Sequence, residues 1–314
     1  MFVYLLRRIA MTLPTLLLVA VAVFALIRLI PGDPAQLMLG DSADAVQLNA
    51  LRHQLGLDQG VIRQFASWLG RVLRGDFGVS ISSGEPVLSM VLERFQVSAV
   101  IVLVAVAIAA CLAVPAGLLA AWKQNKTLDV AIVIGATLLV SVPSFWLGLV
   151  LLLVFGLQLG WLPVVGYVGF GENFGEGLLY VVLPIATLAI IEVGILTRMA
   201  RASAIEVLRL EYVAHARAKG ASESRVLLRH VLPNAFGPTL TLIGLVLGHL
   251  LGGIAVLETV FTLPGLGRLL VDAIFARDYP VVQGCLLFTA VIYVVINLVV
   301  DLLYPLFDPR VALQ

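Results

Sequence analysis

Long apolar runs with few charges limit this chain to a small set of folds. Six runs come close to the 20 or so residues that a helix needs to cross a bilayer core, and they lie near residues 9–30, 97–121, 130–157, 178–197, 236–257 and 281–305. Hydrophobic residues make up 61% of the chain and charged residues only 12%, which is outside the range of a soluble globular domain. Because lipid offers the backbone no hydrogen-bond partners, each run should be helical. The sequence therefore predicts an all-α polytopic membrane protein with six transmembrane helices.

The first run resembles a signal peptide in its position, since it follows Arg7 and Arg8. It is, however, long enough to span a bilayer, and it ends in Pro31-Gly32-Asp33-Pro34 without a small-x-small cleavage site. We therefore expect it to be a retained membrane anchor.

The distribution of charge predicts which side of the membrane each segment faces. With the N-terminus inside, the inner segments carry twelve Lys or Arg against five Asp or Glu, and the outer segments carry eight against twelve. The positive-inside rule then places both termini in the cytoplasm. The net charge is only +1, and the basic residues form no single surface away from the membrane, so the lipid bilayer is an expected partner and nucleic acid is not.

Residues 31–96 are too polar to span a membrane and should form an insertion outside it. Ser42 is a candidate cap for a helix over residues 46–55, and apolar residues at helical spacing predict a second helix over residues 61–72. The Gly- and Ser-rich residues 78–84 should form an extended link. We expect a small helical cap folded onto the membrane domain; a loosely packed loop is the alternative.

Within the spans, Pro115 and Pro143 should kink their helices or widen a gap between helices, because proline removes a backbone donor. Gly244, Gly248 and Gly252 fall four residues apart on one helix face. Small residues at that spacing let two helices approach closely in lipid, so this face should pack inside the bundle.

Three ionisable residues in the spans, His249, Glu192 and Asp301, are candidates for function, because such groups are costly in lipid. Two roles remain open for them, namely hydrogen bonding between helices and contact with cargo or its aqueous path. Cys111 and Cys285 both lie in apolar runs, so neither a disulfide nor a metal site is expected.

A basic segment at residues 211–233 interrupts the apolar character of the chain between the fourth and fifth runs. Glu211 should begin a helix that Gly220 ends in a left-handed conformation. Ser222 should cap a second helix that leads to Pro233. The sequence predicts two short helices joined by a sharp turn. Such a segment suits docking to a partner, and attraction to anionic lipid is the alternative.

The order of residues in this segment resembles the EAA loop of ATP-binding-cassette (ABC) importer permeases. The resemblance lies in Ala214-His215-Ala216, Gly220 and Leu232-Pro233, although Ala214 and His215 depart from the Glu-Ala of the family. The departures are similar to those of the dipeptide/oligopeptide/nickel branch. Further motifs that resemble this branch are Pro31-Gly32-Asp33-Pro34-Ala35, Leu55-Gly56-Leu57-Asp58, Gly75-Asp76-Phe77-Gly78, Pro264-Gly265-Leu266-Gly267-Arg268 and Arg277-Asp278-Tyr279-Pro280.

The resemblance implies the transmembrane domain of a type I ABC importer, as the first permease of a pair in a bacterial inner membrane. Its expected partners are a second homologous permease, two ABC ATPase subunits and a periplasmic solute-binding protein. Its expected cargo is di- or oligopeptides, with nickel chelates or glutathione as alternatives. The expected parts are residues 1–30 with the first span, a periplasmic insertion at 31–96, and a five-helix core at 97–314 that contains the coupling loop 199–235.

The resemblance also assigns residues to two contact sites. Those that would couple to an ATPase are Glu211, Tyr212, Ala214, His215, Ala216, Arg217, Ala218, Lys219, Gly220, Arg225, Arg229, Leu232 and Pro233. Those that would meet the binding protein or form an outer gate are Pro264, Gly265, Leu266, Gly267, Arg268, Arg277, Asp278 and Tyr279.

No Gly-Lys pair occurs in the sequence, so the chain lacks the phosphate-binding loop of an ATPase. We expect ATP and Mg to act on the partner ATPase subunits, and no cofactor or metal to bind this chain. Other signatures of catalysis, such as Gly-x-Ser-x-Gly or His-Glu-x-x-His, are also missing from the sequence. A self-contained membrane enzyme or secondary carrier is the competing interpretation.

Overall fold

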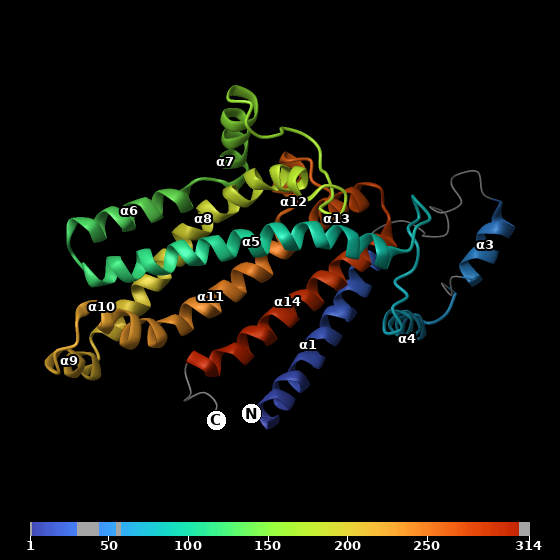
Figure 1. Cartoon of the computed structure of the whole chain (residues 1–314). Helices are drawn as coiled ribbons and strands as arrows, with labels where there is room; N and C mark the ends of the chain where they lie inside the picture. Colours follow the sequence, from blue (N-terminus) through green and yellow to red (C-terminus); the bar gives the residue numbers. More distant parts are fainter. Residues whose placement is uncertain (1, 30–43, 55–57, 308–314) are drawn as a thin grey trace.

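The computed structural model describes residues 2–29, 44–54 and 58–307, and helices dominate these parts (Figure 1). The elements are α1 (Phe2–Leu29), α3 (Ala45–Gln54), α4 (Val61–Val72), α5 (Val87–Trp122), α6 (Thr127–Ser141), α7 (Ser144–Leu151), η1 (Leu152–Gln158), α8 (Phe174–Leu208), α9 (Glu211–Ala218), α10 (Glu223–Val226), η2 (Leu227–Val231), α11 (Leu232–Gly253), α12 (Ala255–Val260), α13 (Leu266–Phe275) and α14 (Tyr279–Phe307). The two η elements are π-helical.

Four of the described helices are long and apolar enough to cross a membrane, namely α5, α8, the continuous helix Glu223–Gly253 and α14. The bent pair formed by α6 and α7–η1 makes a fifth crossing if it is counted as one span. The apolar stretch Ala10–Leu26 of α1 is a shorter apolar helix. Among the described residues, the six predicted runs thus all fall on helices, and α8 extends well past the run predicted to end near residue 197.

The apolar run predicted near residues 130–157 forms two helices with a sharp bend between them. Helix α6 ends at Ser141, α7 begins at Ser144, and their directions differ by 93°. The cause is Pro143, which has no backbone N–H and keeps Val142 in an extended conformation with φ −88° and ψ 126°. The kink predicted at Pro143 is confirmed as a full break. Pro115, in contrast, lies within the unbroken helix α5.

The main hydrophobic core lies where α5, α8 and α11 pack together, as Figure 1 shows. Ile101 from α5, Leu188 from α8 and Leu251 from α11 are among its buried side chains. The N-terminal end of α1 and the C-terminal end of α14 lie toward the same end of the bundle as α9. Helices α3, α4 and α13 lie toward the opposite end.

The glycine-rich face of α11 packs against α14, as the spacing predicts. A Cβ atom would lie 2.5 Å from Val300 at Gly244 and 2.4 Å from Tyr293 at Gly248. At Gly252 it would lie 3.0 Å from a methyl group on α14. Any larger side chain at the first two positions would force α11 and α14 apart.

A buried ion pair joins α6 to α8. Two guanidinium nitrogens of Arg201 donate to the carboxylate of Asp129, with Nε–Oδ1 at 2.6 Å and Nη2–Oδ2 at 2.7 Å. The backbone N–H of Asn125, which has a φ of 63°, donates to the same carboxylate at 2.9 Å. Asp129 therefore fixes the α5–α6 turn to α8 just before the segment at residues 211–233.

Helices α3 and α4 confirm the two helices predicted in the insertion, while the proposed cap Ser42 lies outside the described residues. The prediction of an extended link at residues 78–84 is wrong, because Val79 pairs with Pro86 across a tight turn. Helix α5 begins at Val87, inside the segment that was predicted to lie outside the membrane.

Candidate functional site

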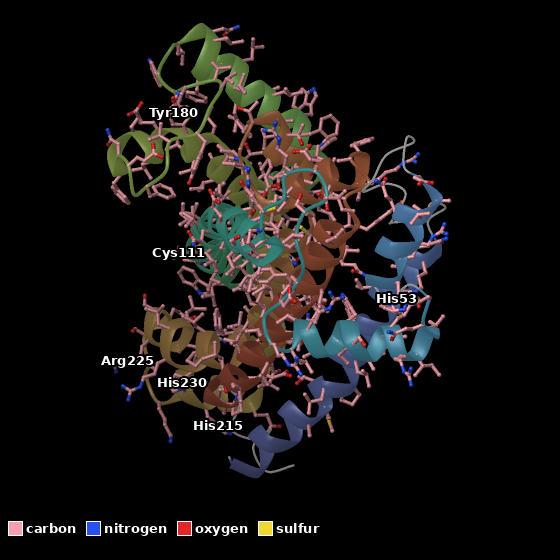
Figure 2. The ribbon with its side chains drawn as sticks, turned by 90° about the vertical axis from the view of Figure 1, so that its right-hand side faces the viewer. His53, Cys111, Tyr180, His215, Arg225 and His230 are labelled. Atoms are coloured by element: carbon pink, nitrogen blue, oxygen red, sulfur yellow. The ribbon has the colours of Figure 1, made fainter. Side chains whose placement is uncertain are left out.

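The basic segment at residues 211–233, which we call the elbow, projects from one end of the bundle (Figure 1). Figure 2 shows His215, Arg225 and His230 gathered at this end. The elbow joins α8 to α11, two helices of the main core.

Helix α9 forms the first arm and begins at Glu211, as predicted. Leu210 before it is extended, with φ −74° and ψ 143°. The carboxylate of Glu211 lies in the first turn, and His215 and Arg217 lie in the last turn. These charges have the signs that favourably complement the helix dipole.

The turn between the arms depends on Gly220, which has a φ of +79°. Its N–H donates to the carbonyl of Arg217 at 2.9 Å, and the N–H of Ala221 donates to the carbonyl of Ala216 at 3.2 Å. Together the two bonds form a Schellman motif. The left-handed turn predicted at Gly220 is therefore confirmed.

The second arm is not the separate short helix that was predicted. Helix α10 continues through η2 into α11, so that one helix runs from Glu223 to Gly253. A proline ring clashes with the carbonyl four residues earlier, and the wider π-helical turns directly before Pro233 let the helix continue. Ser222 is at the N-cap position, but its side chain makes no capping hydrogen bond.

Side-chain hydrogen bonds hold the two arms together. The carboxylate of Glu223 accepts bonds from Arg217 at 2.9 and 3.1 Å and from the indole N–H of Trp122 on α5 at 3.1 Å. The hydroxyl of Tyr212 donates to the carbonyl of His230 at 3.3 Å. Because these groups are partly exposed, each bond adds little stability, but together they fix the angle of the turn.

The underside of the elbow is apolar and packs on the bundle. Val213, Val226 and Val231 are fully buried. They share a cluster with Leu118 of α5 and Ala204 of α8. Since the cluster includes residues of both arms and of two long helices, the elbow has a rigid base and cannot move independently of the ends of α5 and α8.

The outward face of the elbow carries most of the residues predicted to couple to an ATPase. Those with exposed side chains or backbone are Glu211, Tyr212, Ala214, His215, Arg217, Ala218, Lys219, Gly220, Arg225, Arg229 and Pro233. Ala216 and Leu232 are half-buried. The sequence analysis missed Leu228, an exposed apolar side chain on the second arm.

At the opposite end, a buried carboxylate organises the start of α13. Glu258 is 1% exposed. Its Oε1 accepts a bond from the hydroxyl of Ser98 at 2.6 Å, and its Oε2 accepts one from the N–H of Arg268 at 2.8 Å. The hydroxyl of Ser98 in turn accepts a bond from the N–H of Leu266 at 2.9 Å. Burial raises the pKa of Glu258, although these donors oppose the effect.

The two glycines of the Pro264–Arg268 motif allow close contact with this group. A Cβ at Gly265 would lie 2.0 Å from the carboxyl group of Glu258, and one at Gly267 would lie 2.8 Å from the backbone of Ala255. Leu266 is also buried, and Pro264 and Arg268 are half-buried. These residues therefore determine the packing at this end of the bundle and are not an exposed docking surface. The role of Glu258 was missed because its partners are distant in sequence.

The second part of the predicted outer site also has a buried centre. Asp278 accepts bonds from the hydroxyl of Ser80 at 2.5 Å and from the hydroxyl and N–H of Ser82 at 2.9 and 3.2 Å. Burial alone would raise the pKa of Asp278, but these donors outweigh burial and hold the pKa below its usual value. Tyr279 is buried beside Asp278, whereas Arg277 is exposed with a φ of 54°.

The three candidate path residues lie on three different helices. Glu192 is buried on α8, between Leu188 and Leu196, which both pack into the core. Its Oε2 has no hydrogen-bond partner among the described residues. His249 is exposed on α11, and Asp301 is half-buried on α14. Within the described parts, no group of three or more His, Cys, Asp or Glu side chains is arranged to hold a metal ion.

Comparison with known families decides what kind of protein this is. Residues 113–313 match the family described as binding-protein-dependent transport system inner membrane component. Residues 1–102 match the description binding-protein-dependent transport system membrane component, N-terminal. The chain belongs to this family of permeases. It is thus a multi-pass protein of the inner membrane, and the predicted resemblance to ABC importer permeases is confirmed.

Full-length relatives support the same assignment. A putative peptide transport system permease protein of Brucella suis biovar 1 is 42% identical over 98% of both chains. A probable peptide ABC transporter permease protein of Sinorhizobium fredii is 39% identical over 99% of both. The glutathione transport system permease protein of Escherichia coli K12 is 40% identical over 98% of both.

Among solved structures, the permease is similar to a chain in the crystal structure of an amino acid ABC transporter with histidines. That similarity has a TM-score of 0.47 at 19% identity, and it covers 71% of this permease and 94% of the other chain. Permeases of this family act with another permease, ATPases and a binding protein in general.

Proposed function

We propose that this chain is a permease subunit that imports peptides, driven by ATP hydrolysis in separate ATPase subunits. The observation that carries the proposal is the elbow, whose exposed face is basic and whose buried underside joins α5, α8 and the continuous helix Glu223–Gly253. A protein that docks on this face can move three membrane helices together. The chain itself supplies no site for ATP.

The fixed shape of the elbow supports a role in coupling. A flexible loop would absorb the motion of a docked ATPase, whereas the Schellman turn at Gly220 and the bonds from Glu223 to Arg217 and Trp122 resist bending. The second arm continues directly into α11. Displacement of the docked face is therefore expected to tilt α11 within the bundle.

The orientation follows from the same proposal. The elbow and both termini face the cytoplasm, where the ATPases lie, and α13 with Arg277 faces the periplasmic binding protein. A second homologous permease completes the cargo path. We propose the organisation that the sequence predicts, with one change: the core begins at Val87, because α5 is one continuous helix from that residue.

The proposal that peptides are the cargo is based on the relatives, two of which are named as peptide permeases. Glutathione is a second candidate, because the Escherichia coli relative is named for it at 40% identity. Glutathione is itself a tripeptide, so both candidates present an ammonium group, amide bonds and carboxylates to the path. Glu192, buried within the core, is a candidate to meet such cargo.

Transport by the reconstituted complex tests the function. The native complex is placed in liposomes with binding protein on its outer face and ATP on its ATPase face. Labelled dipeptide, labelled tetrapeptide and labelled glutathione are then compared. We expect uptake of a peptide that stops when ATP is replaced by a non-hydrolysable analogue. Uptake by the permease pair without ATPases would contradict the proposal. Uptake of glutathione alone would restrict the cargo to the second candidate.

A further inference from the structure

Helix α4 crosses the direction of the membrane helices. Figure 1 shows α4 end-on, whereas α5 runs across the same view. In Figure 2, turned by 90°, the light-blue α4 lies across the view and α5 is seen end-on. Helix α4 thus runs across the direction of α5. If α5 spans the bilayer, α4 runs parallel to its surface.

One apolar stripe of α4 is attached to a membrane helix. The rings of Phe65 and Trp68 lie 5.1 and 5.5 Å from the ring of Phe24 on α1. Arg28 lies 3.7 Å above the ring of Phe24 and donates a hydrogen bond to Gln64 of α4. Since Phe24 is within the last two turns of α1, these contacts place α4 at the level where α1 ends.

A second apolar stripe lies beside the first and faces outward. Ile62, Leu69 and Leu73 follow an i, i+7, i+11 pattern that places them on one side of the helix, where Leu69 is half-buried and the other two are exposed. Ile62 is 86% exposed and Leu73 is 78% exposed. These apolar side chains lie on α4 beside the end of α1, and leaving them in water costs free energy. We therefore expect lipid or protein to cover this stripe.

The charged residues on the polar side of α4 are all cationic. Arg63 and Arg71 are exposed, Arg74 lies two residues after the end of the helix, and residues 61–74 contain no Asp or Glu. Phosphate groups of anionic lipids complement such a charge pattern. An apolar stripe flanked by arginines, on a helix that lies across the spans, matches the arrangement of an interfacial membrane helix.

We propose that α4 lies in the bilayer surface at the end of the bundle opposite the elbow. Ile62 and Leu73 reach the boundary of the acyl chains, and the arginines bind anionic headgroups. In this arrangement the insertion is anchored to lipid as well as to α1, which fixes the height of the outer segments above the membrane. The inference goes beyond the proposed function, because it depends on neither cargo nor coupling.

Spin labelling of the full chain in its native complex tests the proposal. Exposed Cys111 is first replaced by alanine. A nitroxide is then attached at Ile62→Cys or Leu73→Cys, with Ser67→Cys on the polar side of α4 as the matched control. The complex is reconstituted in vesicles of phosphatidylcholine and phosphatidylglycerol. Collision with oxygen, which concentrates in lipid, is compared with collision with a water-soluble nickel chelate.

We expect the ratio of oxygen to nickel collisions to be several-fold higher at positions 62 and 73 than at position 67. Ratios at positions 62 and 73 as low as that of a label in water would place the stripe in water and overturn the proposal. Labels at 62 and 73 shielded from both reagents would show a protein cover instead, such as a partner subunit, and would also overturn it. Removal of phosphatidylglycerol should move the labels outward, and an unchanged depth would overturn the role given to the arginines.

Discussion

Replacement of Gly220 by valine should uncouple ATP hydrolysis from transport. A Cβ at this position would meet no atom within 4 Å, so steric contact with neighbours does not oppose the change. The cost comes from the φ of +79°, which disfavours a β-branched residue by about 1–2 kcal/mol. This free energy corresponds to a factor of about 5–30 in the population of the native turn.

A graded series separates backbone conformation from side-chain size. Asparagine tolerates the left-handed region better than alanine or valine does, although it is larger than alanine. Coupling should therefore fall in the order Gly220, Gly220→Asn, Gly220→Ala and Gly220→Val. If side-chain size at the docking face were decisive, Gly220→Asn would instead be worse than Gly220→Ala.

The assay measures transport per ATP hydrolysed by the complex in proteoliposomes, together with the recovery of ATPase subunits during purification. Gly220→Val should insert into the membrane normally but show a lower transport ratio or lose its ATPases. Wild-type assembly and transport in Gly220→Val would refute the reasoning, because the Schellman turn would then not be needed for coupling.

Three other contacts give separate predictions. Asp129→Asn leaves Arg201 without its counter-ion and should destabilise the chain by about 3 kcal/mol, which a lower melting temperature in detergent would show. Gly265→Ala places a methyl group against Glu258 and should lower the free energy of unfolding by about 1–3 kcal/mol. The melting temperature should fall in the same assay, and an unchanged value would mean that α13 moves to make room for the methyl group. Because the pKa of Asp278 is lowered by folding, its contribution to stability is present above the unfolded pKa and is lost as pH falls through the folded pKa. The protection of the residue 80–84 amides against hydrogen exchange, taken relative to the intrinsic rate at each pH, should therefore fall on acidification below about pH 4. Asp278→Asn should lower this protection already at pH 7.

Local sequence signals predicted much of the fold. The left-handed turn at Gly220, the helix that starts at Glu211 and the glycine face of α11 each depend on nearby residues or on helical spacing. The break at Pro143 was predicted as a kink, but its angle of 93° was not. That angle depends on how α7 packs, which local pattern does not encode.

The contacts that sequence did not predict join residues far apart in the chain. Glu258 meets Ser98 across 160 positions, and Asp278 meets Ser80 across 198. Each is a single polar group whose partner is set by helix packing, so no spacing rule identifies the pair. The prediction for the second arm of the elbow was wrong for another reason. Pro233 predicts the end of a helix, but the π-helical turns before it let the helix continue.

The central claim is that the exposed face of the elbow receives an ATPase subunit in the cytoplasm. A photoreactive amino acid at His215, which lies on that face (Figure 2), tests it most directly in the native complex in membrane vesicles. The account predicts a cross-link to an ATPase subunit, whose yield changes when ATP is bound. A cross-link to lipid alone would contradict the account. Labelling of a His215→Cys variant from outside intact cells by a membrane-impermeant thiol reagent would contradict it as well.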